Sequence, residues 1–286
     1  MVRDPVKPGG VFHALRDNLG SIRKVYLRGN RIVRRGDFAL YPETVLLLHG
    51  FFQTRNVWEI MEDRLRHDGY GVFSFDLGGL LWRFNTRSIA DLSAMIADKL
   101  EGVCARYGLE RFHVVGHSKG GLIARHYIQN HGGAARVKSL ITLGTPHHGT
   151  PLAALGVGLM AGGVLSRSPL DMVPGSPFLK LLARDQFPPE IPLVSVFSRQ
   201  DLVCPWWGAT LRPKEGESSM KNVTVKGVGH TALTHDAGVY HIVRIELERA
   251  SALWRARAAE AQGVVAAGAA DSPASRQHRN DSVLSE

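Results

Sequence analysis

The sequence has little cysteine and no long apolar run. Only two cysteines occur among 286 residues, too few for the disulfide framework of a small secreted domain, so we expect Cys104 and Cys204 to be free, buried thiols. The longest apolar stretch, 152–165, is too short and too rich in glycine to cross a membrane. Residues 1–10 lack the apolar core of a secretory signal. These absences favour a cytoplasmic protein, with export by another route left open.

Acidic residues are also in the minority, since 26 Asp and Glu face 35 Lys and Arg and leave a net charge of +9. Much of the excess is dispersed over residues 23–35. Neither interleaved aromatic residues nor a basic helix accompany it, so we interpret it as a solvated basic face and predict no nucleic-acid partner. Attraction to anionic lipid surfaces is the weaker alternative.

Short apolar runs alternate with segments of helical periodicity along most of the chain. Such alternation predicts an α/β fold, with a mostly parallel central sheet covered by helices on both faces. The predicted strands are 44–48, 71–75, 112–115, 137–143, 191–197 and 223–226. The predicted helices are 56–67, 88–107, a segment directly after residue 118, and 234–249.

Three regions depart from this alternation. Residues 1–43 are interrupted by Gly, Pro and Arg, and we interpret them as an N-terminal extension packed on the core. The α/β domain spans 44–249 and contains a Gly- and Pro-rich insertion at about 150–190, which suits a helical cap or lid above the strand ends. Residues 250–286 are predicted to form a disordered tail.

The most informative motif is Gly116-His-Ser-Lys-Gly120, which follows a predicted buried strand and opens a predicted helix. A serine on a sharp strand-to-helix turn needs neighbours with almost no side chain two positions away on each side. Ser118 would then project its hydroxyl into a cleft beside the positive end of a helix. An ordinary glycine-rich turn carrying a solvated serine is the alternative.

A serine nucleophile requires a base, and the base requires an acid that orients it. Among the later carboxylates only Asp201 comes directly after a predicted strand. His230 follows the last strand on a loop, whereas its rivals, His235 and His241, fall within the predicted closing helix. We therefore predict Ser118, Asp201 and His230 as a catalytic triad.

Acyl transfer also needs donors for the oxygen anion of the tetrahedral intermediate. The turn itself places the backbone N–H of Lys119, and the loop after the first strand offers the N–H of Phe51. In the same regions His49 is interpreted as bracing its loop and His117 as a packing residue.

The neighbouring histidines His147 and His148 raise the question of a metal. No Cys or carboxylate cluster accompanies them, so we predict no metal and no cofactor. We assign Phe52, His148 and Leu152 to the walls that bind substrate.

Together these segments resemble the α/β-hydrolase fold, and within it the bacterial triacylglycerol lipases. The resemblance covers about residues 44–248, and its narrowest motif is the Gly-Thr-Pro-His-His-Gly segment at 144–149. Its matching segments are 45–51, 116–121, 143–149, 174–179, Asp201 and 229–230. Lys119 departs from the residues usual in such lipases, so its charge could alter ester preference, and we find no convincing calcium site.

The resemblance implies a serine carboxylic-ester hydrolase, a lipase or esterase, that acts on lipid or fatty-acyl esters through an acyl-enzyme. Contact with a lipid interface through the lid belongs to this expectation. An acyltransferase with the same triad and a short-chain esterase are the alternatives. A non-catalytic lipid-binding protein is disfavoured because all three triad residues are present.

Overall fold

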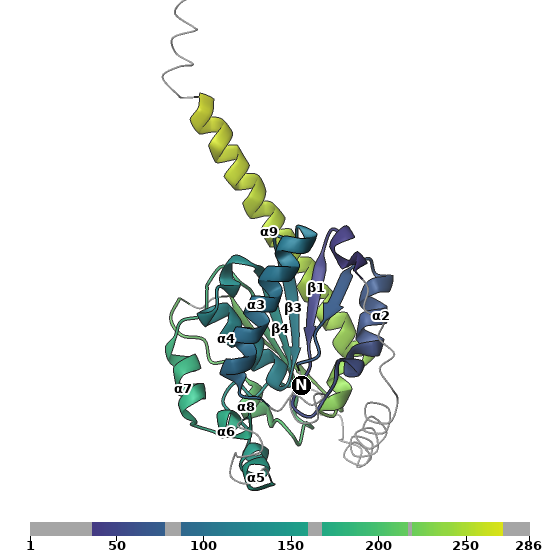
Figure 1. Ribbon diagram of the computed structural model, residues 1–286, viewed down its shortest axis with the longest axis vertical. Coiled ribbons are helices and arrows are strands. Elements are labelled where there is room, and N and C mark those ends of the chain that lie inside the picture. Colours follow the sequence, from purple (N-terminus) through teal and green to yellow (C-terminus); the bar gives the residue numbers. More distant parts are fainter. Residues whose placement is uncertain (1–35, 78–86, 160–167, 217–218, 271–286) are drawn as a thin grey trace, which may run out of the picture. The chain divides into compact units, whose positions relative to one another are not determined.

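The computed structural model of the protein describes residues 36–77, 87–159, 168–216 and 219–270 (Figure 1). The chain falls into two units, one ending at Leu247 and the other beginning at Glu248. The first unit contains the sheet and every predicted site residue. Most of the predicted N-terminal extension, residues 1–35, lies outside the described residues. Its last part forms a short 3₁₀ turn, η1 (Asp37–Leu40), whose Phe38 is buried.

The centre of the first unit is a sheet of six parallel strands in the order β2-β1-β3-β4-β5-β6. The inner strands are buried along almost their whole length because helices cover both faces, which explains their continuous apolar sequences. This confirms the predicted α/β class with a mostly parallel sheet. The strands are β1 (Thr44–Leu48), β2 (Gly71–Ser74), β3 (Phe112–His117), β4 (Val137–Leu143), β5 (Leu193–Ser198) and β6 (Met220–Val225).

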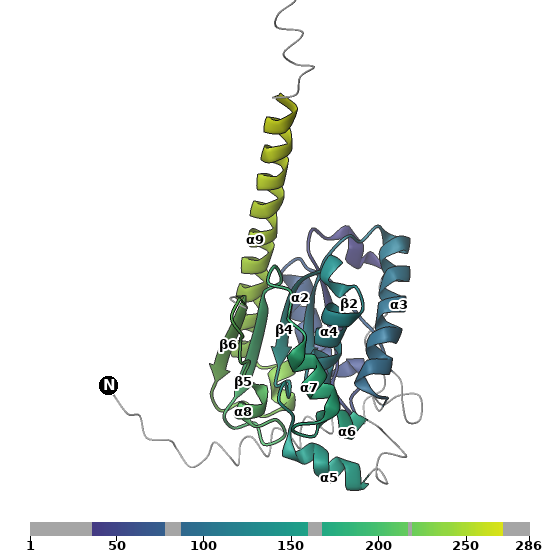
Figure 2. The same cartoon turned by 90° about the vertical axis from the view of Figure 1, so that its left-hand side faces the viewer.

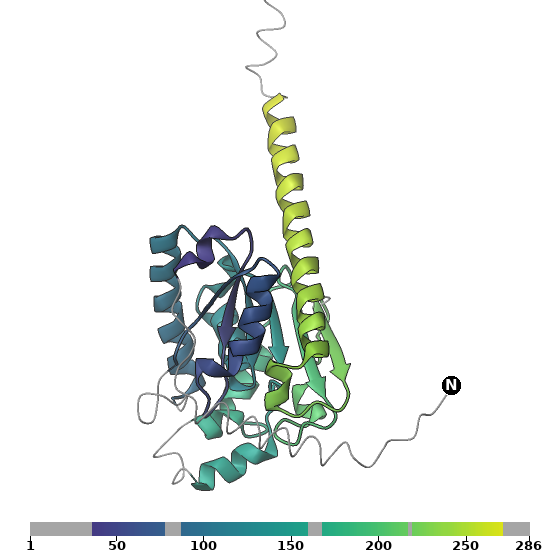
Figure 3. The same cartoon turned by 90° about the vertical axis from the view of Figure 1, so that its right-hand side faces the viewer.

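Two pairs of helices cover the two faces of the sheet (Figures 1 and 3). One face packs against α3 (Ile89–Tyr107) and α4 (Lys119–Asn130). The other packs against η2 (Arg55–Trp58), α2 (Glu59–His67) and the first turns of α9 (Ala237–Ala270). Helix α3 begins as predicted, since the Ser88 hydroxyl accepts a hydrogen bond from the Asp91 N–H at 3.1 Å.

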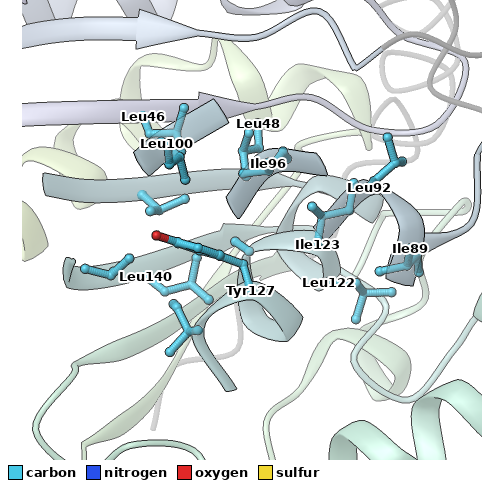
Figure 4. Close-up of a cluster of buried hydrophobic side chains, with 14 of the residues drawn as sticks. Leu46, Leu48, Ile89, Leu92, Ile96, Leu100, Leu122, Ile123, Tyr127 and Leu140 are labelled. Atoms are coloured by element: carbon cyan, nitrogen blue, oxygen red, sulfur yellow. The ribbon is translucent and has the colours of Figure 1, made fainter. Parts of the chain in front are cut away.

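The larger apolar core lies between the sheet and the helix pair α3 and α4. Figure 4 shows side chains from one face of α3 meeting those of β1 and α4. Their spacing along α3 is three or four residues, the period of one helical face. The labelled members are Leu46, Leu48, Ile89, Leu92, Ile96, Leu100, Leu122, Ile123, Tyr127 and Leu140.

In its described residues, the predicted insertion between β4 and β5 contains three short helices. They are α5 (Pro151–Leu159), α6 (Ser168–Met172) and α7 (Pro177–Arg184), and we call them the cap. Figure 2 places them beside the carboxyl ends of the strands, together with α8 (Trp206–Ala209). Several hydrogen bonds fix the cap on the domain. Among them, the Ile89 N–H donates to Asp171 Oδ2 at 2.7 Å, and the Gln129 amide donates to the carbonyls of Leu182 at 3.2 Å and of Asp185, just after α7, at 2.6 Å.

The last helix differs from its prediction at both ends. It begins at Ala237 rather than residue 234, because Asp236 Oδ1 accepts a hydrogen bond from the Val239 N–H and η6 (Thr231–Thr234) precedes it. It continues to Ala270, so the expectation of disorder is wrong for 250–270, where frequent alanine favours helix. Residues 271–286 lie outside the described residues. No helix in the described ranges is both long and apolar enough to cross a membrane.

The two cysteines are free and buried, as predicted. Burial raises the pKa of the Cys104 thiol and, far more strongly, that of Cys204. Both therefore stay protonated at neutral pH, and neither is a nucleophile in this state.

Candidate active site

The predicted turn at Ser118 joins β3 to α4 with strained backbone geometry. Ser118 has φ +53° and ψ −125°, a left-handed conformation that few residues other than glycine adopt. The structure holds it there with three hydrogen bonds. The Ser118 N–H donates to the Leu143 carbonyl at 2.9 Å, and the Ser118 carbonyl accepts from the Gly121 N–H and from the Thr145 hydroxyl. Strain maintained in this way is common at functional sites.

The two motif glycines are required by close approach. A methyl group added at Gly116 would lie 2.6 Å from the Cα of Gly121, and one added at Gly120 would lie 2.2 Å from the Leu48 carbonyl oxygen. Both distances are shorter than side chains tolerate, and both obstacles are backbone atoms. The steric explanation of the motif therefore holds in the structure.

Asp201 and His230 form a buried, hydrogen-bonded pair. Asp201 Oδ2 lies 2.7 Å from His230 Nδ1, while its Oδ1 accepts from the N–H groups of Val203 and Cys204. Only 3% of Asp201 and 6% of His230 is exposed. A carboxylate with both oxygens occupied in this way fixes the ring and keeps the proton on Nδ1, leaving Nε2 able to accept one.

Gly144 gives this pair its space. It has φ +55°, and a methyl group there would lie 3.0 Å from Asp201 Oδ2 and 3.2 Å from His230 Nδ1. The residue contributes no functional group, yet any side chain would push against the carboxylate–imidazole contact.

Ser118 and His230 open on the same cavity, whose volume is about 390 Å³. Its walls are mostly apolar and are contributed by the cap and by the loops after β1, β4 and β5. Of the predicted substrate-binding residues, Leu152 lines the cavity, whereas Phe52 and His148 do not. The lining residues are Phe51, Gln53, Ser118, Pro146, Thr150, Leu152, Ala153, Leu155, Gly156, Pro169, Met172, Val203, Cys204, His230 and Thr231.

Phe52 and His148 lie elsewhere for identifiable reasons. Phe52 has φ +54°, and it is the Phe51 ring that reaches the cavity, with the two rings edge to face at 4.7 Å. The backbone N–H of His148 donates a hydrogen bond to the Gly208 carbonyl at 2.9 Å, which holds the residue beside α8. Assigning either side chain to the cavity wall was wrong.

The two predicted oxyanion donors border Ser118. Lys119 is the first residue of α4, where backbone N–H groups lack helical partners. The Phe51 N–H has no hydrogen-bond partner among the described residues. In the preceding residue, by contrast, the Gly50 N–H donates to Gln53 Oε1 at 2.9 Å. His49 is buried with Nδ1 3.1 Å from the Gly50 carbonyl, in agreement with a bracing role.

The Lys119 side chain does not line the cavity, but its Nζ lies 5.9 Å from the centroid of the Phe51 ring, which does. It is completely buried, and its Nζ donates to the Arg87 carbonyl at 2.5 Å. The Ser168 hydroxyl of α6 donates to the same carbonyl. Burial lowers the pKa of the Lys119 ammonium well below its usual range. The ammonium therefore does not contact the cavity itself, and the Phe51 ring lies between them, so any effect of Lys119 on ester preference stays a prediction.

His117 does more than the predicted packing. Its Nδ1 lies 2.9 Å from Gln53 Oε1, and its Nε2 lies 3.0 Å from the His230 carbonyl oxygen. Gln53 was missed in the sequence because nothing in the apolar pattern marks it. The available signal was its place three residues after Gly50, where a side-chain oxygen can reach back to that backbone N–H.

The first of the neighbouring histidines, His147, is buried against β4. His147 Nε2 contacts the Thr142 hydroxyl at 3.1 Å, and its burial lowers the pKa well below the usual range. In the described part of the chain no group of three or more His, Cys, Asp or Glu residues could hold an ion.

Comparison with known proteins agrees with this fold. A family model described as alpha/beta hydrolase fold matches residues 43–161, which include Phe51 and Ser118 but end before Asp201 and His230. The chain thus has the α/β-hydrolase fold, as its motifs predicted.

Several solved structures share the fold at low sequence identity. A mature lipase of Bacillus licheniformis aligns with a TM-score of 0.59 and 18% identity, over 77% of this chain and 96% of the other. A structure from a study of carboxylesterases of Nitrososphaera gargenis gives 0.54 and 15%, over 74% and 92%.

One curated relative matches over a shorter region. It is the dihydrolipoyllysine-residue acetyltransferase component of the acetoin cleaving system of Cupriavidus necator. The match is 37% identical over 98 residues, covering 33% of this chain and 24% of the relative.

Proposed function

We propose that the protein is a serine hydrolase that cleaves carboxylic esters with apolar acyl groups through an acyl-enzyme intermediate. One observation carries the proposal: the buried Asp201–His230 pair opens on the same apolar cavity as Ser118, which sits on a strained turn. Hydrolases among the structural neighbours, a lipase and carboxylesterases, support the reaction class.

In the proposed reaction, His230 Nε2 takes the proton of the Ser118 hydroxyl as its oxygen attacks the ester carbonyl carbon. The carbonyl oxygen becomes an anion that receives hydrogen bonds from the Phe51 and Lys119 N–H groups. When the carbon–alkoxide bond breaks, His230 returns the proton to the leaving alcohol. Water, deprotonated by the same ring, then attacks the acyl-enzyme and releases the acid and Ser118.

Before catalysis the serine and the histidine are not yet joined. No hydrogen bond links the Ser118 hydroxyl to the His230 ring in the described part of the structure. Such contacts often tighten only when substrate is bound. The proposal requires the Ser118 hydroxyl to come within hydrogen-bonding distance of His230 Nε2 on substrate binding, while Asp201 holds the ring.

The cavity favours uncharged, apolar acyl groups. None of its lining residues carries a formal charge when His230 is neutral, and a charged acyl group would lose its hydration there without a partner. The cap also carries exposed leucines: Leu152 and Leu155, which line the cavity, are 45% and 62% exposed, and Leu170, which does not, is 42% exposed. We propose that these residues contact aggregated lipid substrates, so that the cap acts as a lid.

An acyltransferase is the second candidate, because a curated relative that matches part of the chain is named an acetyltransferase component. The same acyl-enzyme would then pass its acyl group to an alcohol or thiol instead of water. Incubation with an ester and a competing alcohol, followed by product analysis, separates the two. A new ester formed in excess of the free acid would favour transfer.

The test of the proposal is turnover of p-nitrophenyl butyrate by the wild type and by Ser118→Ala. We expect the variant to lose at least about 10³-fold in kcat, because the nucleophile is removed. Ser93→Ala is the matched control, since Ser93 is also buried but its hydroxyl bonds only the carbonyls of Ile89 and Ile123. Equal turnover by wild type and Ser118→Ala would end the proposal.

A further inference from the structure

His117 and Gln53 connect two parts of the site that lie far apart in the sequence. Gln53 belongs to the loop after β1, which carries the Phe51 N–H, and His117 is the last residue of β3. Through Gln53 Oε1, His117 is joined to the Gly50 N–H; through its other ring nitrogen it contacts the backbone carbonyl of His230. We call these two side chains the bridge.

The proton positions in the bridge follow from its partners. The Gly50 N–H can only donate, so the Gln53 atom facing it is the amide oxygen, and the same oxygen faces His117 Nδ1. The His230 carbonyl facing His117 Nε2 can only accept. Both ring nitrogens of His117 thus face acceptors, whereas a neutral imidazole carries one N–H.

A neutral ring can therefore bond only one of its two partners at a time. The imidazolium would bond both, but His117 is completely buried and stands beside another histidine, with ring centroids of His117 and His230 4.6 Å apart. Burial, together with the neighbouring His230, His49 and His235, lowers the pKa of His117 well below its usual value. The ring is neutral near pH 7, and one hydrogen bond of the bridge is exchanged for the other rather than added.

From this geometry we propose that His117 and Gln53 are positioning residues. They set the loop after β1, which carries the Phe51 N–H, at the right distance from His230, so that both can act on an ester bound at Ser118. The inference rests on the proposed function. Neither side chain takes a proton from substrate or donates one to it. The His117 ring stands between two backbone segments, one reached through Gln53 next to the Phe51 N–H and one at His230, and it hydrogen-bonds one of them at a time while remaining in contact with both. In this way the ring sets the separation of the two segments, which decides whether both reach a bound ester.

The expected consequence is a loss of activity without a loss of fold. A displacement of about 1 Å in a catalytic group can cost on the order of 100-fold in rate. We expect Gln53→Leu and His117→Leu each to lower kcat/KM for p-nitrophenyl butyrate by about 10- to 100-fold. The double variant should lose no more than the worse single variant, because both substitutions break one connection.

Two further variants separate positioning from mere core packing. His113→Leu removes another completely buried histidine of β3, one that contacts Ser139 and Glu43 instead of the site. It should unfold at lower temperature than wild type but keep kcat/KM within about threefold. Gln53→Glu keeps an acceptor for both bridge contacts. Its kcat/KM should be at least fivefold higher than that of Gln53→Leu.

The readouts are kcat and KM measured from pH 5 to 9, alongside thermal unfolding of each variant. Bridge variants should change kcat more than KM and displace the acid limb of the kcat/KM profile, which reports His230. If His117→Leu fails to fold, the comparison of Gln53→Leu with Gln53→Glu still tests the bridge. Losses that add in the double variant, an equal loss in His113→Leu, or unchanged kinetics in Gln53→Leu would overturn the bridge. An inactive wild type would instead overturn the proposed function.

Discussion

The floor of the cavity and its cap are built in opposite ways. The floor consists of the loops after the strands, where polar atoms are buried and paired: the Asp201 carboxylate alone accepts two backbone N–H bonds and contacts His230. The cap exposes large apolar side chains, up to 62% at Leu155. The paired polar atoms of the floor hold the candidate catalytic groups at fixed distances, whereas the apolar side chains of the cap offer adaptable contact area for different acyl groups.

The sharpest test of the floor is Asp201→Asn. The amide cannot accept the His230 Nδ1 proton while still accepting from the Val203 and Cys204 N–H groups, so the ring adopts the wrong tautomer. We expect kcat on p-nitrophenyl butyrate to fall by about 10³- to 10⁴-fold. The exposed Asp63→Asn is the control and should match wild type. A loss of less than tenfold in the kcat of Asp201→Asn would contradict the proposal that Asp201 orients His230 for catalysis.

Acid should weaken both regions through buried histidines. Burial lowers the pKa of His49, in the floor, and of His126, which packs against Phe178 of the cap, to about 4. Below about pH 6.5 the unfolded chain binds protons that the folded chain does not. Stability is therefore complete above that pH and declines as the pH falls towards 4.

Thermal unfolding at pH 7.5 and 5.0 measures this decline. We expect each of the two histidines to lower the free energy of unfolding by roughly 1–2 kcal/mol at pH 5 relative to pH 7.5. The loss of stability between pH 7.5 and pH 5.0 should be smaller in His126→Leu by the contribution of one histidine, because leucine cannot bind a proton. If His126→Leu loses as much stability on acidification as wild type, then His126 does not contribute to the acid destabilisation.

The smallest expected effect concerns the outer surface of the cap. Leu170 of α6 is 42% exposed and does not line the cavity. Leu170→Gln should lower activity on an emulsified medium-chain triglyceride by about threefold, since it removes apolar contact with a lipid surface. Activity on dissolved p-nitrophenyl acetate should not change. Leu40→Gln, at a site 85% exposed on η1, is the control. Equal activity of Leu170→Gln and wild type across the solubility limit would contradict the lid proposal.

Sequence patterns predicted the floor better than the details within it. Strands β1 and β4 begin and end at the predicted residues, because strands buried on both faces appear as continuous apolar runs. Asp201 and His230 were found because ligands of parallel sheets gather at strand ends, and the structure brings the two together.

What the sequence did not predict depends on backbone conformation or on tertiary contacts. Phe52 was assigned to the cavity because it is large and apolar, but its φ of +54° places Phe51 there instead. Gln53 matters only once that turn is formed and its oxygen meets the Gly50 N–H. Lys119 appeared as a charge beside the nucleophile, while the Arg87 carbonyl that receives its Nζ comes from a distant segment.

Gly144 shows how absence can be essential. A methyl group there would lie 2.8 Å from Leu233 Cδ1, 3.0 Å from Asp201 Oδ2 and 3.2 Å from His230 Nδ1, so we expect Gly144→Ala to disturb the Asp201–His230 contact although glycine has no functional side chain. A survey of inactive variants that recorded turnover alone would count this position beside Ser118. The space beside the Asp201–His230 contact is therefore as much a part of the candidate site as the two side chains themselves.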